Sequence, residues 1–505
     1  MRILRCLLLA ACLAFPAAAQ PAAKKPRLIT LDEAIQLALQ HNLDLQIVRY
    51  NPQASLYELN AAYGGYDPVF SFTGEHDYRV SGGGLDSDNR QIPPSTSDSD
   101  VLGASLGGLL PWGLNYNFRF NANDTSGNGF FFDTNINDYV ASPFKNTSGA
   151  ALIDMRQPLL KNFWIDGTRL NIAVAKNRLK YSELTLRQQI INTATAVELA
   201  YYDLVSSEEN VKVQEKATQL AEQLYKENRK RVEVGVMAPL DEKQAESQAA
   251  SARANLLSAQ RAVEMSQNVL KTLITDNYGE LHDVDLVAGE NLTAPRQYFN
   301  VKESWMLGLT ERPDLLQAKL DLERAGVELK YLKNQVYPQL DAFGTYGRSG
   351  TSTDYGGVLN NISGGDLPFW VVGGQLTIPL SNVQARNRYK AGKVTVEQAV
   401  LSLKRMEQII MVQIDDGIKS AQAAFERVDA TRQARLYAEA ALDAEQKKLE
   451  SGKSTSFFVL QLQRDLTSAR SEEIRALTDF NKALATLAQR EGSTLVRQKI
   501  DVQVK

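Results

Sequence analysis

The feature that most constrains this sequence is a long stretch without helix-breaking residues. Thr168–Arg231 contains neither proline nor glycine and is rich in Ala, Leu, Gln, Glu, Lys and Arg, the residues that favour an α-helix. Its apolar side chains recur at spacings of three, four and seven residues, which is typical of a coiled-coil seam. That seam comprises Val174, Tyr181, Leu184, Ile191, Ala194, Tyr201 and Val205. One helix over this stretch would be about 95 Å long at 1.5 Å per residue, far longer than the helices of globular domains.

The second half of the chain repeats this organisation. A second coiled-coil pattern predicts a long helix over Asn387–Ser451. Shorter helices are predicted over Leu31–Ala62 and Leu240–Thr275 in the first half, and over Asp314–Val336 and Ser454–Arg490 in the second. In each half the two shorter helices, stacked end to end, would run alongside the long one. Self-similarity of this kind marks an internal repeat.

The repeat changes the expected domain organisation. Length alone suggests about three domains for 505 residues, whereas the repeat predicts one fold built twice. Each copy runs helix, strands, long helix, glycine turn and helix, with strands over 69–157 in the first copy and 339–378 in the second. The expected boundaries are a first repeat at 20–276, an equatorial connecting segment at 277–310, a second repeat at 311–491 and a C-terminal tail at 492–505.

The N-terminus predicts export from the cytoplasm. Met1–Arg5 is basic, Cys6–Phe15 is apolar and small residues lead up to Ala19, so residues 1–19 are expected to be a secretory signal peptide. The alternative is lipid attachment, because the sequence ending at Cys12 resembles a bacterial lipobox. The chain after Cys12 contains no cysteine, which excludes a disulfide framework, a Cys-ligated zinc site and a thiol nucleophile.

Composition excludes further classes of function. The 56 Lys+Arg and 59 Asp+Glu leave a net charge of −3, which argues against a nucleic-acid binder. A mean hydropathy of −0.29 argues against a bundle of apolar membrane helices. The histidines His41, His76 and His282 are scattered, and there is no phosphate loop or Ser/His/Asp set. We therefore expect no enzyme activity, cofactor or metal site.

Between the helices the pattern changes to strict alternation. Over Leu114–Ala122 apolar residues alternate with Asn and Arg, which predicts a strand with one apolar and one polar face. Six such strands are predicted, over Val69–Arg79, Val101–Leu109, Gly113–Asn123, Gly149–Gln157, Gln339–Gly347 and Phe369–Ile378. The alternation fits a transmembrane β-barrel with an aqueous lumen and fits equally a half-solvated sheet of a soluble domain.

The connections favour the barrel. Ser81–Asp100, Asp124–Ser148 and Arg348–Asp366 are expected to be long polar loops, whereas Leu110–Gly113 is a tight turn. Outer-membrane barrels show this asymmetry between outer loops and periplasmic turns. Six strands are too few for a wide pore, since small barrels have about eight. Because sheet edges cannot stay open in lipid, such a barrel must close by oligomerisation.

Five segments, in this order, resemble the TolC family of outer-membrane efflux proteins over essentially the whole mature chain. They are Leu31–Asn42, Gln157–Leu160, Arg312–Leu315, Val234–Asp241 and Ser451–Leu460. The resemblance implies a mixed α and β membrane protein, a homotrimer whose outer-membrane β-barrel is continued by a long periplasmic α-helical barrel. It also implies a passive duct for efflux or secretion. The alternative class is a periplasmic coiled-coil structural protein that bridges envelope layers.

The resemblance also implies partners. These are a periplasmic adaptor (membrane fusion) protein, an inner-membrane pump of RND or ABC type, and outer-membrane lipid, with no nucleic acid. One departure concerns the strands: family members commonly have two per repeat in the barrel, and the first half here has four. An enlarged barrel and an extra outer layer both remain open.

The candidate site residues lie at the two glycine turns. Gly235 and Gly452 end the long helices, as glycine after a helix C-terminus typically does. The resemblance implies that these turns dock onto the adaptor. The docking residues would be Gly235, Val236, Pro239, Gly452, Lys453 and Ser454.

The candidate gate residue is Asp241. It matches a family position that lines the tunnel entrance, although a carboxylate near a helix N-terminus also serves as a dipole partner. Phe458 and Gln461 stand where some members have aspartates, which argues against a second acidic ring.

Overall fold

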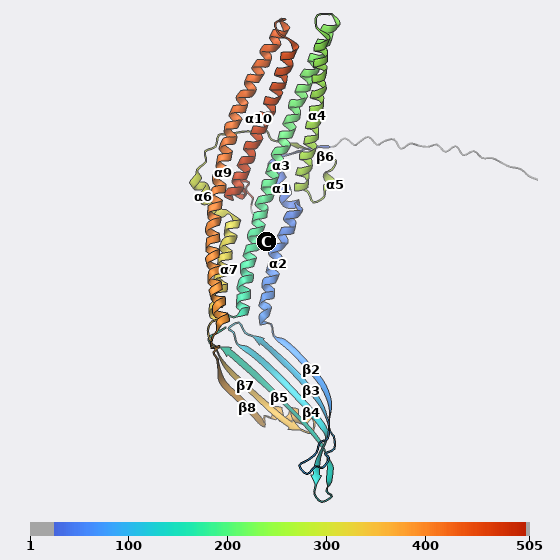
Figure 1. Cartoon of the computed structure of the whole chain (residues 1–505), viewed down its shortest axis with the longest axis vertical. Helices are drawn as coiled ribbons and strands as arrows, with labels where there is room; N and C mark the ends of the chain where they lie inside the picture. The colour runs from blue at the N-terminus through green and yellow to red at the C-terminus, as the bar shows by residue number, and fades with distance from the viewer. Residues whose placement is uncertain (1–24, 501–505) are drawn as a thin grey trace, which may run out of the picture. The chain divides into compact units, whose positions relative to one another are not determined.

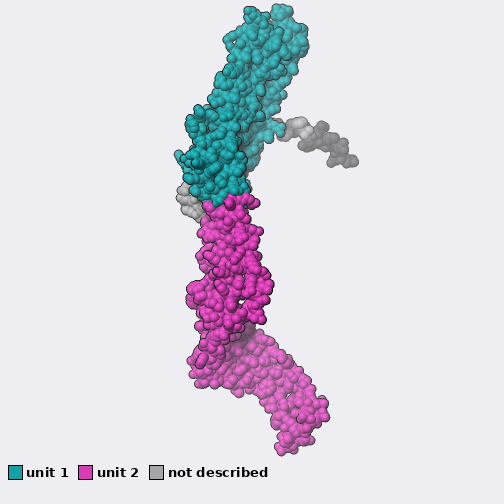
Figure 2. Space-filling view, turned by 60° about the vertical axis from the view of Figure 1, so that its left-hand side comes forward, with its two compact units in different colours: residues 1–50, 185–316, 407–505 teal, residues 51–184, 317–406 magenta. Residues whose placement is uncertain are grey.

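The structure, a computed structural model, describes residues 25–500 (Figure 1). The predicted signal peptide at 1–19, the alternative lipid site at Cys12 and the last five residues lie outside the described residues. The chain divides into two compact units (Figure 2). Within the described residues, unit 1 comprises 25–50, 185–316 and 407–500, and unit 2 comprises 51–184 and 317–406.

Two very long helices are present where the sequence predicted them. Helix α3 (Gly167–Glu233) has 67 residues and α9 (Val383–Glu450) has 68, so each is about 100 Å long. In unit 1, α3 continues through a turn into α4 (Pro239–Ile274), and α9 continues in the same way into α10 (Ser456–Glu491). Both pairs form antiparallel hairpins (Figure 1).

Equivalent ion pairs join the two helices of each hairpin. Arg253 on α4 donates to Glu222 on α3 at 2.6 Å, and Arg470 on α10 donates to Glu439 on α9 at 2.7 Å. The partners of both pairs are 31 residues apart in the chain. The two hairpins therefore have the same local geometry at matching positions.

The first helix expected from the sequence is two helices. The prediction of a single helix over Leu31–Ala62 is wrong because Asn42 is extended, with φ −63° and ψ 120°. The side-chain oxygen of Asn42 accepts a hydrogen bond from the N–H of Leu45 at 3.0 Å. Asn42 thus ends α1 (Leu31–His41) and caps α2 (Leu43–Tyr63), as asparagine does at helix N-termini.

The core of unit 1 lies where α1, α3 and α4 meet a small sheet. Strand β1 (Lys25–Ile29) pairs in parallel with β6 (Val284–Ala288), a pairing that the sequence did not predict. Tyr201 on α3 is fully buried, and its hydroxyl donates to the carbonyl of Ile29 at 3.2 Å. Burial raises the pKa of Tyr201 to about 12. The short helices α5 (Tyr278–Leu281), α6 (Val301–Glu311) and α11 (Thr494–Arg497) complete the unit.

Unit 2 contains one antiparallel sheet of six strands in the order β2-β3-β4-β5-β7-β8. All six strands expected from the sequence are in it. They are β2 (Val69–Ser81), β3 (Ser95–Leu109), β4 (Asn115–Asp133), β5 (Asp138–Pro158), β7 (Gln339–Ser352) and β8 (Leu367–Thr377). Helix α7 (Pro313–Asn334) leads into β7.

Two of the expected long loops are wrong. The segment Asp124–Ser148 continues β4 and β5 as a paired hairpin out to Asp133 and Asp138. This segment is rich in Asn, Ser and Gly and lacks the apolar alternation that predicts a strand. It pairs all the same, because backbone hydrogen bonding does not require an apolar face. The segment Arg348–Asp366 contains α8 (Tyr355–Gly364), capped by Asp354.

Helix α8 packs against strands β5 and β7 of the sheet. A Cβ atom at Gly350 would lie 2.8 Å from the carbonyl oxygen of Val358, and one at Gly149 would lie 2.9 Å from a methyl carbon of the same residue. Both sheet positions therefore need glycine, which allows the helix to approach the strands closely.

Candidate functional site

The two tip turns have the same backbone geometry. Gly235 and Gly452 adopt φ of 77° and 72°, a left-handed conformation that favours glycine. The N–H of Val236 donates to the carbonyl five residues earlier at 2.9 Å, and that of Lys453 does so at 2.8 Å. With a second bond from each glycine N–H, both turns are Schellman motifs. The prediction that glycine ends each long helix is confirmed.

The tips expose apolar side chains. Val234, Val236 and Leu240 are 74%, 72% and 67% exposed around the first turn, and Phe457 and Phe458 are about half exposed near the second. No described atom lies within 4 Å of a Cβ built at either tip glycine. The tips therefore present apolar surface with free space around it, as a docking surface would.

Two of the predicted docking residues, Pro239 and Ser454, have local structural roles beside the turns. Pro239 is the first residue of α4, a position where its missing N–H is not needed. Ser454 donates a hydrogen bond to Glu445 on α9, and this bond, together with Lys448, lowers the pKa of the Glu445 carboxyl group. This hydrogen bond connects the second turn to helix α9 of the same hairpin.

Asp241 connects the two hairpins. The hydroxyl of Ser456, the first residue of α10, donates to Asp241 Oδ1 at 3.1 Å. Ser456 is only 1% exposed, so its hydroxyl has little access to water. The side chain of Asn228 on α3 also donates to the main-chain carbonyl of Asp241 at 3.3 Å. Sequence reasoning found Asp241 and missed both partners. Ser456 is 215 positions away, and nothing in the chain marks a contact at that separation. Asn228 is 13 positions away, on the other side of the tip turn.

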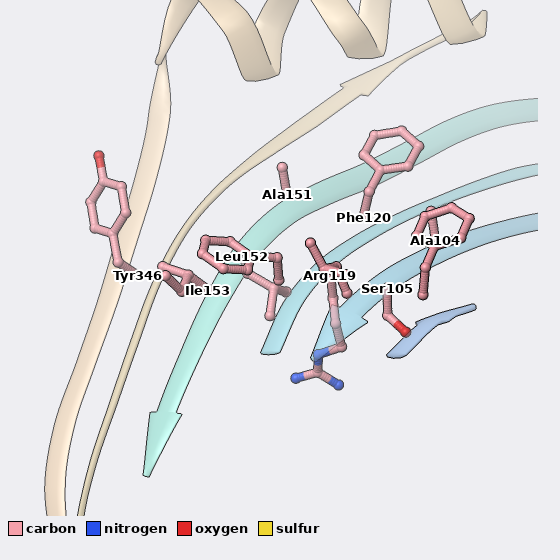
Figure 3. Close-up of a pocket in the computed structure, with 11 residues that line it drawn as sticks. Ala104, Ser105, Arg119, Phe120, Ala151, Leu152, Ile153 and Tyr346 are labelled. Atoms are coloured by element: carbon pink, nitrogen blue, oxygen red, sulfur yellow. The ribbon is translucent and has the colours of Figure 1, made fainter. Parts of the chain in front are cut away.

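A second functional region is the apolar face of the sheet. The strand registers place one residue from every strand in a single row across it. That row is Phe70, Leu106, Phe118, Ile153, Tyr346 and Trp370. Figure 3 shows most of this region, a shallow hollow of about 420 Å³ that also includes Phe120 and Ala151. The face that the sequence predicted to be apolar is therefore continuous over all six strands.

The opposite face carries a network of polar side chains. Arg119 forms an ion pair with Asp154 at 2.6 Å, and the hydroxyl of Thr345 donates to the same carboxylate at 2.7 Å. Ser71 and Ser105 share a hydrogen bond of 2.6 Å. A sheet with one apolar and one hydrogen-bonded polar face suits a boundary between lipid and water.

Within residues 25–500, none of the helices is long and apolar enough to cross a membrane. In the same range, no group of three or more His, Cys, Asp or Glu side chains is arranged to hold a metal ion.

A family model described as outer membrane efflux protein matches residues 131–275 and 307–493, which is more than half of the chain. The chain belongs to this family. The outer membrane efflux protein BepC of Brucella suis biovar 1 (strain 1330) is 23% identical over 350 residues, covering 68% of this chain and 72% of BepC. The outer membrane protein TolC of Vibrio cholerae is 22% identical over 375 residues, covering 71% of this chain and 81% of TolC.

The fold agrees with this membership. The solved structure of the Campylobacter jejuni CmeC outer membrane channel superposes with a TM-score of 0.65 at 14% identity, covering 92% of this chain and 86% of CmeC. The family predicted from the sequence motifs is confirmed. The protein is an outer-membrane efflux channel with a large periplasmic helical part. The alternative of a structural coiled coil that bridges envelope layers is not favoured.

Proposed function

We propose that the protein is a passive homotrimeric duct whose sheet forms a transmembrane β-barrel and whose helices form a periplasmic tunnel. The observation that carries this proposal is the apolar row across six strands backed by a polar face. The apolar face would contact lipid and the polar face would line the aqueous lumen. Substrates would arrive through a periplasmic adaptor and an inner-membrane pump of RND or ABC type.

The proposal includes the repeat, with copies at 20–276 and 311–491. Two pairs of features support it. Gly235 and Gly452 end their helices in the same motif, and the Arg253–Glu222 and Arg470–Glu439 ion pairs have the same separation in the chain.

The adaptor would dock at the tips, through Gly235, Val236 and Pro239 on one hairpin and Gly452, Lys453 and Ser454 on the other. The exposed apolar side chains beside these residues supply the contact area. Asp241 would act as a gate residue, because its bond to Ser456 holds the two hairpins together at the entrance.

The docking proposal is tested by replacing Gly235 with valine. A Cβ at this position meets no described atom within 4 Å, so the substitution acts through the backbone. A left-handed conformation costs an ordinary L-residue about 1–2 kcal/mol, and more for a β-branched one. We expect Gly235→Val to lower adaptor-dependent efflux, measured as drug susceptibility of a channel-deficient strain carrying the variant, while the trimer stays intact.

The matched control is Gly235→Asn. Asparagine is similar in size to valine but tolerates the left-handed region, so this variant should export at close to the wild-type level. Equal export by the valine variant and the wild type would refute the docking role of the turn.

A further inference from the structure

The sheet of unit 2 has two free edges. Strand β2 pairs only with β3, and β8 pairs only with β7, among the described residues. All but one residue of β2 are exposed, whereas most residues of its neighbour β3 are half-buried. The apolar side chains Phe70 and Trp370, at opposite ends of the same row, are 68% and 73% exposed. Each edge strand therefore lacks a neighbour on one side.

Free edges are incompatible with lipid. Backbone N–H and C=O groups that face hydrocarbon have no water to bond with, so spanning sheets are closed. Six strands cannot close within one chain, since the smallest barrels have about eight. The edges must be covered by another chain that offers a strand of its own.

The directions of the strands identify that chain as a second copy. All five pairings in the sheet are antiparallel, so β2 and β8 run in opposite directions. The β8 of one copy can then continue onto the β2 of the next copy as an ordinary antiparallel pair. The apolar row reaches both edges without a break, so the continued sheet keeps one apolar face and one polar face.

We propose that β2 of each copy pairs with β8 of the next and that three copies close a barrel of eighteen strands. The number of copies rests on the proposed homotrimer, and the strand count rests on the six-stranded sheet of each copy. All six strands belong to one continuous ladder, which leaves none for a separate outer layer. Barrels of 16–18 strands enclose an aqueous channel, so the membrane part would admit bulky solutes.

The test is disulfide cross-linking across the seam in native outer membranes. Phe72→Cys on β2 is combined with a cysteine at every second position of β8, because the scan covers every register of the new pair. The matched control is Phe120→Cys on β4 with the same β8 scan. Phe72 and Phe120 lie in one row and on one face of the sheet, so they are expected at the same depth. The wild-type chain, treated identically, controls for Cys6 and Cys12.

We expect Phe72→Cys to give covalent trimers on a denaturing gel with at least one β8 position, and Phe120→Cys to give none. Cross-linking of Phe120→Cys in place of Phe72→Cys would overturn the eighteen-stranded barrel and leave the trimer standing, because the barrel would then close on β4 with twelve strands. No cross-link in a particle of trimer mass would also overturn it. A monomeric particle would refute the homotrimer itself.

A second measurement does not depend on the variants. A density map of the wild-type trimer in detergent should show eighteen strands in cross-section. Any smaller count overturns the proposal, even where a cysteine variant fails to reach the outer membrane.

Discussion

Removing the hydroxyl of Ser456 should open the periplasmic entrance. Ser456 is buried and donates to the carboxylate of Asp241 on the other hairpin. Hydrogen bonds to charged groups contribute about 1.5–3 kcal/mol net. Asp241 is half-buried and regains water when the bond is lost, so the lower end of this range applies. A loss of about 1.5 kcal/mol per subunit shifts each hairpin pair toward separation about tenfold.

Purified channels in planar bilayers provide the assay. We expect Ser456→Ala to raise the open probability about tenfold, and by more where all three subunits must open together. Asp241→Ala should behave alike, and the double variant should be no more open than either single variant, because both remove the same bond. The matched control is Thr455→Ala, one residue away, whose exposed side chain makes no capping hydrogen bond.

Two results would refute this reasoning. One is an open probability of Ser456→Ala within twofold of that of the Thr455→Ala control. The other is additivity of the two single variants, which would mean that Asp241 and Ser456 act through separate contacts.

Two further predictions concern a buried carboxyl group of unit 1 and the apolar face of unit 2. Burial raises the pKa of Glu198, which is 1% exposed, so its ionisation opposes folding as the pH rises above the unfolded value of 4.5. Glu198→Gln should raise the thermal unfolding midpoint, measured by circular dichroism in detergent, more at pH 8 than at pH 4. A variant whose midpoint at pH 8 lies below that of the wild type would contradict this. Phe118→Arg should destabilise the membrane-inserted protein by about 2–4 kcal/mol and lower its level in outer membranes. Asn117→Arg, on the polar face, should leave that level unchanged, and equal losses would show that the two faces are not lipid and lumen.

The sequence predicted the elements whose signal is local. Thr168–Arg231 could be assigned to a helix because it lacks proline and glycine, and α3 covers it with two further residues at its C-terminal end. The alternation of apolar and polar residues over Leu114–Ala122 identified β4 because this pattern is also local. The tip turns could be predicted from Gly235 and Gly452, because the residue after a helix C-terminus often adopts a left-handed conformation, which favours glycine.

Features that depend on distant partners could not be predicted. The parallel pair of β1 and β6 joins the start of the first repeat to the connecting segment that follows it, as in Lys25 and Val284. Asn42 also donates from its side-chain amide to the carbonyl of Leu273 at 3.1 Å, a contact between residues 231 positions apart that no local pattern marks. For the candidate site, Asp241 was identified by resemblance alone. Its partner Ser456 became visible only when the two hairpins were placed side by side.

The order of strands in the sheet has a consequence for how the protein assembles after export. Neighbouring strands β2 and β3 meet through residues such as Ser71 and Ser105, 34 positions apart. Strands β5 and β7 meet through Asp154 and Thr345, 191 positions apart, with α3, α4 and α7 between them. Contacts between distant parts of a chain form slowly. We therefore expect the β2–β5 meander to form first and the β7–β8 hairpin to pair with β5 later. An unpaired edge strand is a template for aggregation, and the interval in which β5 lacks its partner is the one in which this chain is most open to misassembly.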